Sequence, residues 1–344
     1  MRTAVFSARP YDRRSLADSN AQAGSPLTLD FLDEPGSHSG TGPRLTPRTA
    51  PLADHHDAAC VFTNDDLGRD TLVALDAVGV KTIALRCAGF NNLDIDAARE
   101  LGFRIGRVPA YSPHAVAEHT VALLLALNRK IHRAHARVRE QNFSLEGLLG
   151  RDLNQMTVTV VGAGAIGSVL ARILHGFGCR LLLVDPAPNP DLAGLGAEYR
   201  TLHDALPDTD ALCLTCPLNE HTHHLIDEHA IARMPEGGYI VNTARGAIID
   251  THALIDALKR GHFTGVALDV YEEEEDLFFE DRSMSILTDD VFARLLTFPN
   301  VLITSHQAFF TREALEQIAR ISIENIVAIA KDGAPPQSNR IPGL

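Results

Sequence analysis

Short apolar runs of strand length alternate with stretches of helical periodicity along most of this 344-residue chain. Such alternation is typical of α/β proteins, in which parallel sheets carry helices on their faces. We therefore predict an α/β fold with two Rossmann-like or flavodoxin-like domains. Strands are expected at residues 4–6, 58–63, 81–85, 157–161, 180–184, 211–214, 239–242, 266–268 and 301–303, and helices at residues 70–78, 165–177 and 251–260.

One strand–turn–helix–strand unit carries a glycine motif. Gly162, Gly164 and Gly167 follow the strand at 157–161 in G-x-G-x-x-G spacing. The first glycine permits a tight turn, the second lets backbone N–H groups approach a pyrophosphate, and the third lets the helix pack close to the strand. Since the helix N-terminus adds free N–H donors and partial positive charge, the unit predicts a dinucleotide site. A glycine-rich turn in an unrelated α/β protein is the alternative.

An acidic residue, Asp185, ends the second strand of this unit. A carboxylate at that place can accept hydrogen bonds from the adenosine ribose and repels a 2′-phosphate. Pro186 and Ala187 follow, so neither adjacent residue offers a cation to such a phosphate. The sequence therefore predicts NAD rather than NADP.

The remaining segments predict two domains. The α/β segment before residue 107 lacks a phosphate loop, residues 34–54 read as loop, and residues 107–114 form a proline-punctuated linker. Residues 115–139 predict one long helix whose apolar first half is buried in a domain or a subunit interface. We predict a capped helix from Thr311 to about Lys331 and expect it to return to the first domain. We expect a split substrate domain at 1–110 plus 311–344 and an NAD-binding domain at 111–310.

Composition and charge exclude several classes of binding partner. The net charge of −13 argues against a nucleic-acid surface. No stretch has the length and apolarity of a membrane span or a signal peptide, so we expect a cytoplasmic protein. Cys213 and Cys216 have C-x-x-C spacing without a second pair, and His221, His223 and His224 lack partners at ligand spacing. We therefore predict structural thiols, solvated histidines and no metal.

Three chemically active residues directly follow predicted strands of the nucleotide sheet. Arg245 can hold a carboxylate through two parallel hydrogen bonds, and His306 can exchange a proton near neutral pH. Glu274 beside that histidine would favour the imidazolium. With a nicotinamide hydride donor, the set would reduce the ketone of a 2-oxo acid. A surface ion pair, a core histidine and a solvated acidic face remain the alternatives for the three residues taken singly.

The chain resembles the D-2-hydroxyacid dehydrogenases nearly end to end, and within them the fermentative D-lactate branch. The motifs that carry the resemblance are RCAGFNNLD (86–94), VPAYSP (108–113), AVAEHTVALLLALNRKIHRA (115–134), NFSLEGL (142–148), GAGAIG (162–167), VNTARGAIID (241–250), LDVYEEEEDLFFED (268–281) and SHQAFFT (305–311).

The resemblance implies catalytic roles for Arg245, Glu274 and His306. It also implies a homodimer or homotetramer in which the helix at 115–139 is a dimerisation element. It implies closure of the two domains around the substrate, and it leaves the role of Thr222 open, since an asparagine is frequent there. Substrate contacts are implied for Ala88, Gly89, Tyr111 and Phe309, and NAD contacts for Gly162, Gly164, Ala165, Ile166, Gly167, Asp185, Cys216, Pro217, Thr243, Ala244 and Asp269.

The expected reaction is NADH-dependent reduction of pyruvate to D-lactate. A D-2-hydroxyacid dehydrogenase for a bulkier 2-oxo acid remains an alternative, because one or two methylenes change selectivity only modestly. An NAD-sensing binding protein related to transcriptional corepressors is another, because one fold serves several functions.

Overall fold

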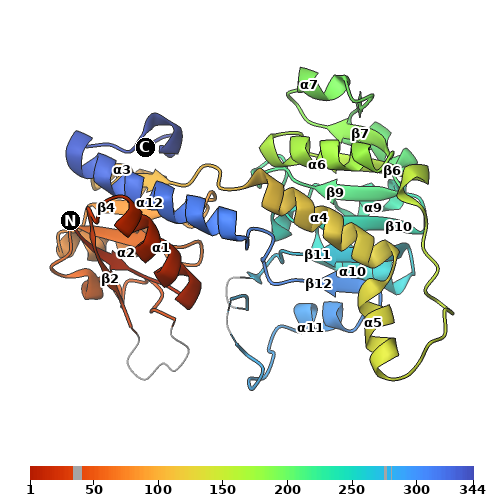
Figure 1. The fold of residues 1–344 in the computed structure, drawn as a ribbon, viewed down its shortest axis with the longest axis horizontal. Helices are drawn as coiled ribbons and strands as arrows, with labels where there is room; N and C mark the ends of the chain where they lie inside the picture. The colour runs from red at the N-terminus through yellow and green to blue at the C-terminus, as the bar shows by residue number, and fades with distance from the viewer. Residues whose placement is uncertain (34–40, 275–276, 280) are drawn as a thin grey trace. The chain divides into compact units, whose positions relative to one another are not determined.

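The computed structural model describes residues 1–33, 41–274, 277–279 and 281–344. The chain divides into two compact units (Figure 1). Unit 1 comprises Met1–Ser112 with Phe310–Leu344, and unit 2 comprises Pro113–Phe309. Each unit holds a parallel β-sheet with helices on its faces, which confirms the predicted α/β class.

Unit 1 contains a five-stranded sheet of order β2-β1-β3-β4-β5, a flavodoxin-like arrangement. Apolar residues of α1 and α12 pack on one face, and those of α2 and α3 pack on the other. The C-terminal helix α12 begins where Thr311 caps Ala314 N–H and ends at Gly333, whose φ is 76°. The elements are β1 (Arg2–Val5), α1 (Pro10–Gln22), β2 (Thr28–Phe31), η1 (Ala50–Ala53), β3 (Ala58–Val61), α2 (Arg69–Ala77), β4 (Thr82–Leu85), α3 (Ile95–Glu100), β5 (Arg104–Arg107), α12 (Arg312–Asp332) and η6 (Gln337–Asn339).

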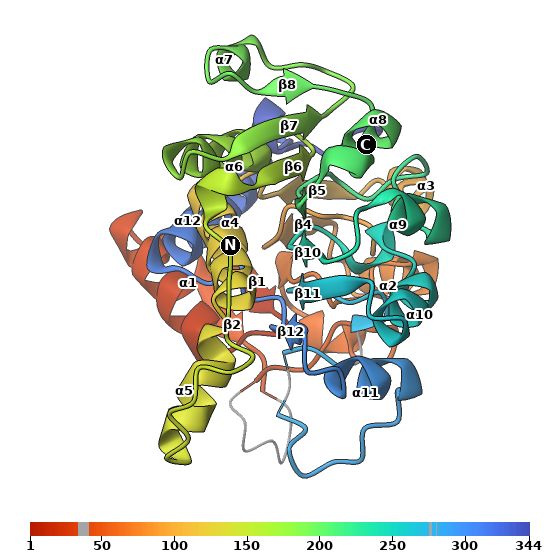
Figure 2. The same cartoon turned by 90° about the vertical axis from the view of Figure 1, so that its right-hand side faces the viewer.

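Unit 2 contains a seven-stranded sheet of order β12-β11-β10-β9-β6-β7-β8, with β8 at its edge (Figure 2). The order reverses between β6 and β9, and ligands of such sheets bind outside the carboxyl ends of the strands at that point. Helices α4 and α6 cover one face, and α9, α10 and α11 cover the other. The strands are β6 (Thr157–Val161), β7 (Arg180–Val184), β8 (Glu198–Tyr199), β9 (Ala211–Leu214), β10 (Gly238–Asn242), β11 (Phe263–Leu268) and β12 (Val301–Ile303).

The helices of unit 2 depart from one prediction. The single helix expected at 115–139 is two helices, α4 (Pro113–Asn128) and α5 (Ile131–Arg139). Lys130 adopts a left-handed conformation with φ 49°, which ends the run of helical hydrogen bonds. The others are η2 (Leu153–Gln155), α6 (Ala165–Gly176), α7 (Pro190–Ala193), α8 (Leu202–Ala205), η3 (Leu206–Asp208), α9 (Glu228–Arg233), η4 (Gly246–Ile248), α10 (Thr251–Lys259) and α11 (Asp290–Leu296).

The prediction also missed weakly patterned elements of unit 1. Helix α1 is mostly polar, strand β2 is only partly buried, and β5 has the sequence RIGR, so none shows a clear apolar period. Because Arg107 ends β5 and Pro113 begins α4, the linker expected at 107–114 is shorter than predicted. No helix in the described part of the chain is long and apolar enough to cross a membrane.

Candidate active site

The glycine loop leaves β6 as a tight turn. Gly162 has φ 94°, and a Cβ there would lie 2.6 Å from Cys216 Cα, so the turn passes directly against the end of β9. A Cβ on Gly167 would lie 1.8 Å from Gly162 O, because α6 packs against the turn. A Cβ on Gly164 would meet nothing within 4 Å. Gly162 and Gly167 thus permit close packing, whereas Gly164 faces open space.

That open face suits a pyrophosphate. Gly164 and Ala165 are exposed at the start of α6, and Ile166 follows half-buried. The first N–H groups of a helix have no partner within the helix and favour anions. Backbone donors beside an uncrowded glycine are what a dinucleotide phosphate requires.

The adenosine end of such a ligand has a matching hollow. A pocket of about 420 Å³ lies at the end of β7, lined by Val184, Asp185, Pro186, Tyr199, Arg200 and Thr201. Asp185 is fixed there, because its carboxylate accepts hydrogen bonds from Ala163 N–H at 2.6 Å and Ala187 N–H at 2.8 Å. The residues of the glycine loop and of this pocket therefore fit NAD.

The predicted triad follows three neighbouring strands. Arg245 comes after β10, Glu274 after β11 and His306 after β12, and β11 pairs in parallel with both neighbours. His306 Nδ1 lies 2.6 Å from Glu274 Oε1, and each side chain is 18% exposed. Since an ionised carboxylate can only accept hydrogen bonds, Nδ1 carries the shared proton, and Nε2 is the ring nitrogen that Glu274 does not engage.

Local hydrogen bonds hold each partner of this pair. Tyr271 N–H donates to Glu274 Oε2 at 2.9 Å, and His306 N–H donates to Asp269 O at 2.7 Å. His306 adopts φ 52°, an uncommon backbone conformation for a non-glycine residue. The residue that contacts Glu274 therefore has a strained backbone conformation.

Arg245 stands on a predicted turn that is held by Asn242, a residue for which no role was predicted. The buried side chain of Asn242 accepts from Ala244 N–H at 3.0 Å and donates to Arg245 O at 2.9 Å. Arg245 Nη1 donates to Ala244 O at 2.7 Å. Asn242 lies inside the VNTARG motif, and its type, an amide at the last position of a strand, was the available signal.

Asp269 is a fully buried carboxylate that anchors the loop of His306. It accepts hydrogen bonds from Thr304 Oγ1 at 2.6 Å, Gln307 N–H at 2.9 Å and Ala308 N–H at 3.0 Å, and His119 Nε2 lies 3.4 Å away. Burial alone would raise its pKa, but these hydrogen bonds outweigh burial and lower the pKa. The predicted NAD contact of Asp269 stays a prediction, whereas its anchoring role was not foreseen.

The other predicted cofactor residues follow the carboxyl ends of β9 and β10. Thr243 and Ala244 are buried on the turn after β10, and Thr243 Oγ1 lies 2.7 Å from Thr120 Oγ1 of α4. Burial raises the pKa of Cys213 to about 12 and that of Cys216 to about 11, so both are thiols.

Thr222 has a role within its own loop. Its hydroxyl donates to Pro217 O at 2.6 Å and accepts from Asn219 N–H at 2.8 Å. Thr222 therefore closes the loop after β9 that contains the exposed Pro217.

One histidine of the nearby loop is not solvated as predicted. His221 and His223 are exposed, but His224 is half-buried and its Nε2 lies 2.6 Å from Glu272 Oε1. Among described residues, His223, His224 and Glu272 place their possible metal-ligand atoms within 4.8 Å of one another. Thr251 Oγ1 donates to the other oxygen of Glu272 at 2.9 Å. Hydrogen bonds thus account for the placement of Glu272.

The predicted substrate residues belong to both units. Phe309, in unit 2, is buried with its ring centroid 6.4 Å from that of His306, and Phe279 lies 5.6 Å from His306. Ala88, Gly89 and Tyr111 belong to unit 1. No acceptor in the described part of the chain takes the amide N–H of Ala88 or Gly89. Their substrate contacts stay predictions.

Comparison with known proteins identifies this arrangement. The family model described as "D-isomer specific 2-hydroxyacid dehydrogenase, NAD binding domain" matches residues 121–308. The chain belongs to the D-isomer specific 2-hydroxyacid dehydrogenase family. As in that family, it is an NAD-dependent oxidoreductase that acts on a CH–OH group, which confirms the predicted cofactor and enzyme class.

Relatives from this family match almost the whole chain. D-lactate dehydrogenase of Escherichia coli K12 is 47% identical over 337 residues, covering 98% of this chain and 99% of the relative. The apo-structure of D-lactate dehydrogenase from Escherichia coli has a TM-score of 0.86 at 44% identity, covering 98% and 99%. D-lactate dehydrogenase from Aquifex aeolicus, complexed with NAD and lactic acid, has a TM-score of 0.81 at 32% identity, covering 96% of each chain. The chain is thus a D-lactate or other 2-hydroxyacid dehydrogenase.

Proposed function

We propose that this protein is a D-lactate dehydrogenase that reduces pyruvate to D-lactate with NADH, reversibly, using His306 as the acid/base. The observation that carries the proposal is the 2.6 Å contact between His306 Nδ1 and Glu274 Oε1 at the carboxyl edge of the nucleotide sheet. Similarity to two D-lactate dehydrogenases over nearly their full length supports the choice of substrate class.

The residues divide the work of the reaction. The Arg245 guanidinium pairs with the substrate carboxylate and polarises the adjacent carbonyl. The glycine loop and Asp185 would hold NADH, which would supply the hydride that the carbonyl carbon accepts. His306 donates the Nε2 proton to the carbonyl oxygen, giving the hydroxyl group, and Glu274 keeps the imidazole oriented and stabilises its protonated form. In the reverse direction, His306 accepts that proton from the hydroxyl.

Aromatic side chains beside His306 favour a small, apolar substrate side chain. The Phe279 and Phe309 rings lie 6.5 Å apart, and both lie near the imidazole. A methyl group suits such apolar walls, whereas a charged side chain would lose hydration there without a partner.

The test is NADH oxidation by the purified protein with pyruvate, 2-oxobutyrate, 2-oxoisocaproate, phenylpyruvate and oxaloacetate, followed by chiral analysis of the product. We expect the highest kcat/KM with pyruvate and a D-configured product. Preference for the bulky acids would move the enzyme to the wider family while keeping the acid/base pair. Bound NADH without turnover of any acid would indicate a sensing role and contradict the proposal.

A further inference from the structure

The pocket at the end of β7 contains an arginine that the predicted NAD preference does not require. Arg200 lines this pocket together with Asp185. Its backbone N–H donates to Leu183 O at 2.9 Å, so the residue is fixed beside β7. A guanidinium near the adenosine ribose is the group that accommodates a 2′-phosphate. An arginine in this wall therefore needs an explanation.

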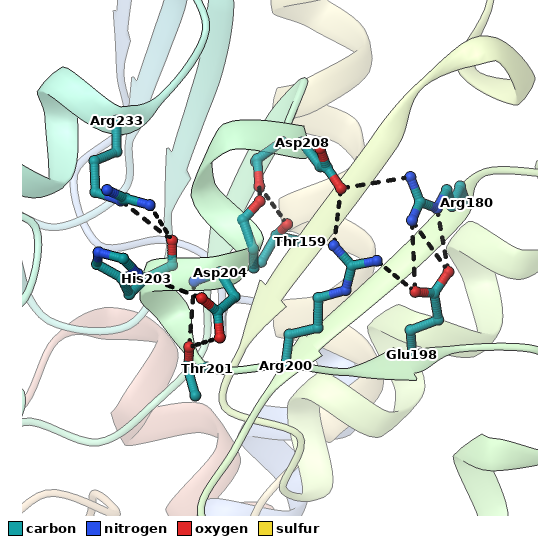
Figure 3. Close-up of polar contacts among 11 residues, drawn as sticks. Thr159, Arg180, Glu198, Arg200, Thr201, His203, Asp204, Asp208 and Arg233 are labelled. Carbon is teal, nitrogen blue, oxygen red and sulfur yellow. Dashed lines mark hydrogen bonds and ion pairs between the residues drawn. The ribbon is translucent and has the colours of Figure 1, made fainter.

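Two carboxylates each accept a hydrogen bond from the guanidinium of Arg200 (Figure 3). Nη2 donates to Glu198 Oε2 at 2.7 Å, and Nη1 donates to Asp208 Oδ2 at 2.8 Å. These hydrogen bonds raise the pKa of Arg200, and the bond from Arg200 lowers the pKa of Glu198. The guanidinium is therefore charged but already engaged.

A second arginine completes the charge balance. Arg180 Nε donates to Glu198 Oε1 at 3.2 Å, and its Nη1 lies 3.8 Å from Asp208 Oδ2. Two arginines and two carboxylates cancel, and Asp185 adds one negative charge. The formal charge around the pocket is thus negative despite its arginine.

We propose that Glu198 and Asp208 determine cofactor specificity by engaging Arg200, so that the adenosine pocket accepts NAD and rejects NADP. A 2′-phosphate would have to compete with two carboxylates for the guanidinium while it faces Asp185. The inference rests on the proposed placement of the ribose at Asp185. It assigns specificity to the partners of a pocket residue rather than to Asp185 alone.

The test measures binding of NADH and NADPH by fluorescence titration to wild type and to the double variant Glu198→Gln/Asp208→Asn. Gln and Asn keep the shape of the acids and remove their charge. We expect the NADPH Kd to fall about tenfold, since a freed guanidinium offers charge-assisted hydrogen bonds. The NADH Kd should change less than about twofold, because NADH has no 2′-phosphate for the freed guanidinium to bind.

Two further variants isolate Arg200. Adding Arg200→Gln to the double variant should cancel the gain in NADPH affinity, whereas adding Arg180→Gln should leave most of it. Asp204→Asn is the control for loss of a nearby carboxylate that does not bond Arg200, because Asp204 accepts from Thr201 Oγ1 at 2.7 Å and lies 3.3 Å from His203 Nδ1. It should leave NADPH binding unchanged.

An unchanged NADPH Kd in the double variant overturns the proposal. So does an equal gain in Asp204→Asn, which would show a general effect of charge, or a gain that survives Arg200→Gln. The ribose placement is checked separately with Asp185→Ala, which should weaken NADH binding. If Asp185→Ala binds NADH like wild type, the placement itself fails. Because the readout is binding, none of these outcomes depends on 2-oxo acid turnover.

Discussion

The two halves of the seven-stranded sheet build their parts of the site in different ways. After β6, Gly162, Gly164 and Gly167 shape a loop whose backbone N–H groups, rather than side chains, are expected to bind phosphate. After β11 and β12, the candidate functional groups are side chains that contact each other, as Glu274 and His306 do. A backbone site is therefore sensitive to added atoms, whereas a side-chain site is sensitive to lost partners.

This difference predicts different kinds of damage. A methyl group added where the glycine loop is crowded should disturb folding and cofactor binding together. Loss of a functional group after β12 should spare both and remove the proton transfer. Binding and turnover measured on the same variants therefore separate the two halves.

The largest effect is expected for His306→Gln. The variant keeps a side chain of polar character but cannot exchange a proton, so kcat should fall about a thousandfold. NADH affinity should stay near the wild-type value, because the glycine loop and Asp185 are untouched. Stopped-flow turnover and NADH fluorescence titration measure the two quantities. Near-normal turnover would show that the acid/base assignment is wrong.

A smaller but broader loss is expected for Gly167→Ala. Its Cβ would lie 1.8 Å from Gly162 O, so α6 must move and the free energy of unfolding should fall by roughly 3 kcal/mol. Gly164→Ala is the matched control, since its Cβ meets no protein atom within 4 Å. We expect it to weaken NADH binding while stability changes by less than about 1 kcal/mol. Equal stability losses in both variants, measured by urea unfolding, would contradict this separation.

The contrast between the two halves of the sheet also explains which parts of the fold and of the site the sequence could predict. The strands at 157–161 and 180–184 were predicted with their observed ends, because glycine spacing and apolar runs are local signals. The contact between Glu274 and His306 was expected from residue types at strand ends together with the family resemblance. The anchors were not predicted, because Asp269 meets Thr304 and His119 only after distant segments pack. Likewise, no apolar period indicates the left-handed Lys130 that divides α4 from α5.

The smallest of these effects is expected for Asp269→Asn. This variant tests whether the buried carboxylate of Asp269 holds the loop of His306 in place. Its carboxylate accepts two backbone N–H groups and the Thr304 hydroxyl. An amide group cannot accept on both sides, so we expect a loss of about 1–3 kcal/mol in the free energy of unfolding at pH 7. Turnover should fall about tenfold through misplacement of His306, while NADH binding changes less.

The pH dependence of the free energy of unfolding tests whether the negative charge of Asp269 is what stabilises the protein. The pKa of Asp269 is lowered in the folded protein, so its stabilising contribution is present above its unfolded pKa of about 3.9 and is lost as pH falls through the folded value. Urea unfolding at pH 7 and at successive steps down to about pH 3 should therefore show wild type losing more stability than Asp269→Asn. Asp256→Asn is the control, because Asp256 is exposed. Its Oδ1 forms a surface ion pair with Lys259 Nζ at 3.0 Å. Its curve should parallel wild type, since an exposed pair adds little stability. If the Asp269→Asn curve also parallels wild type, the buried carboxylate does not hold the loop of His306 through its charge.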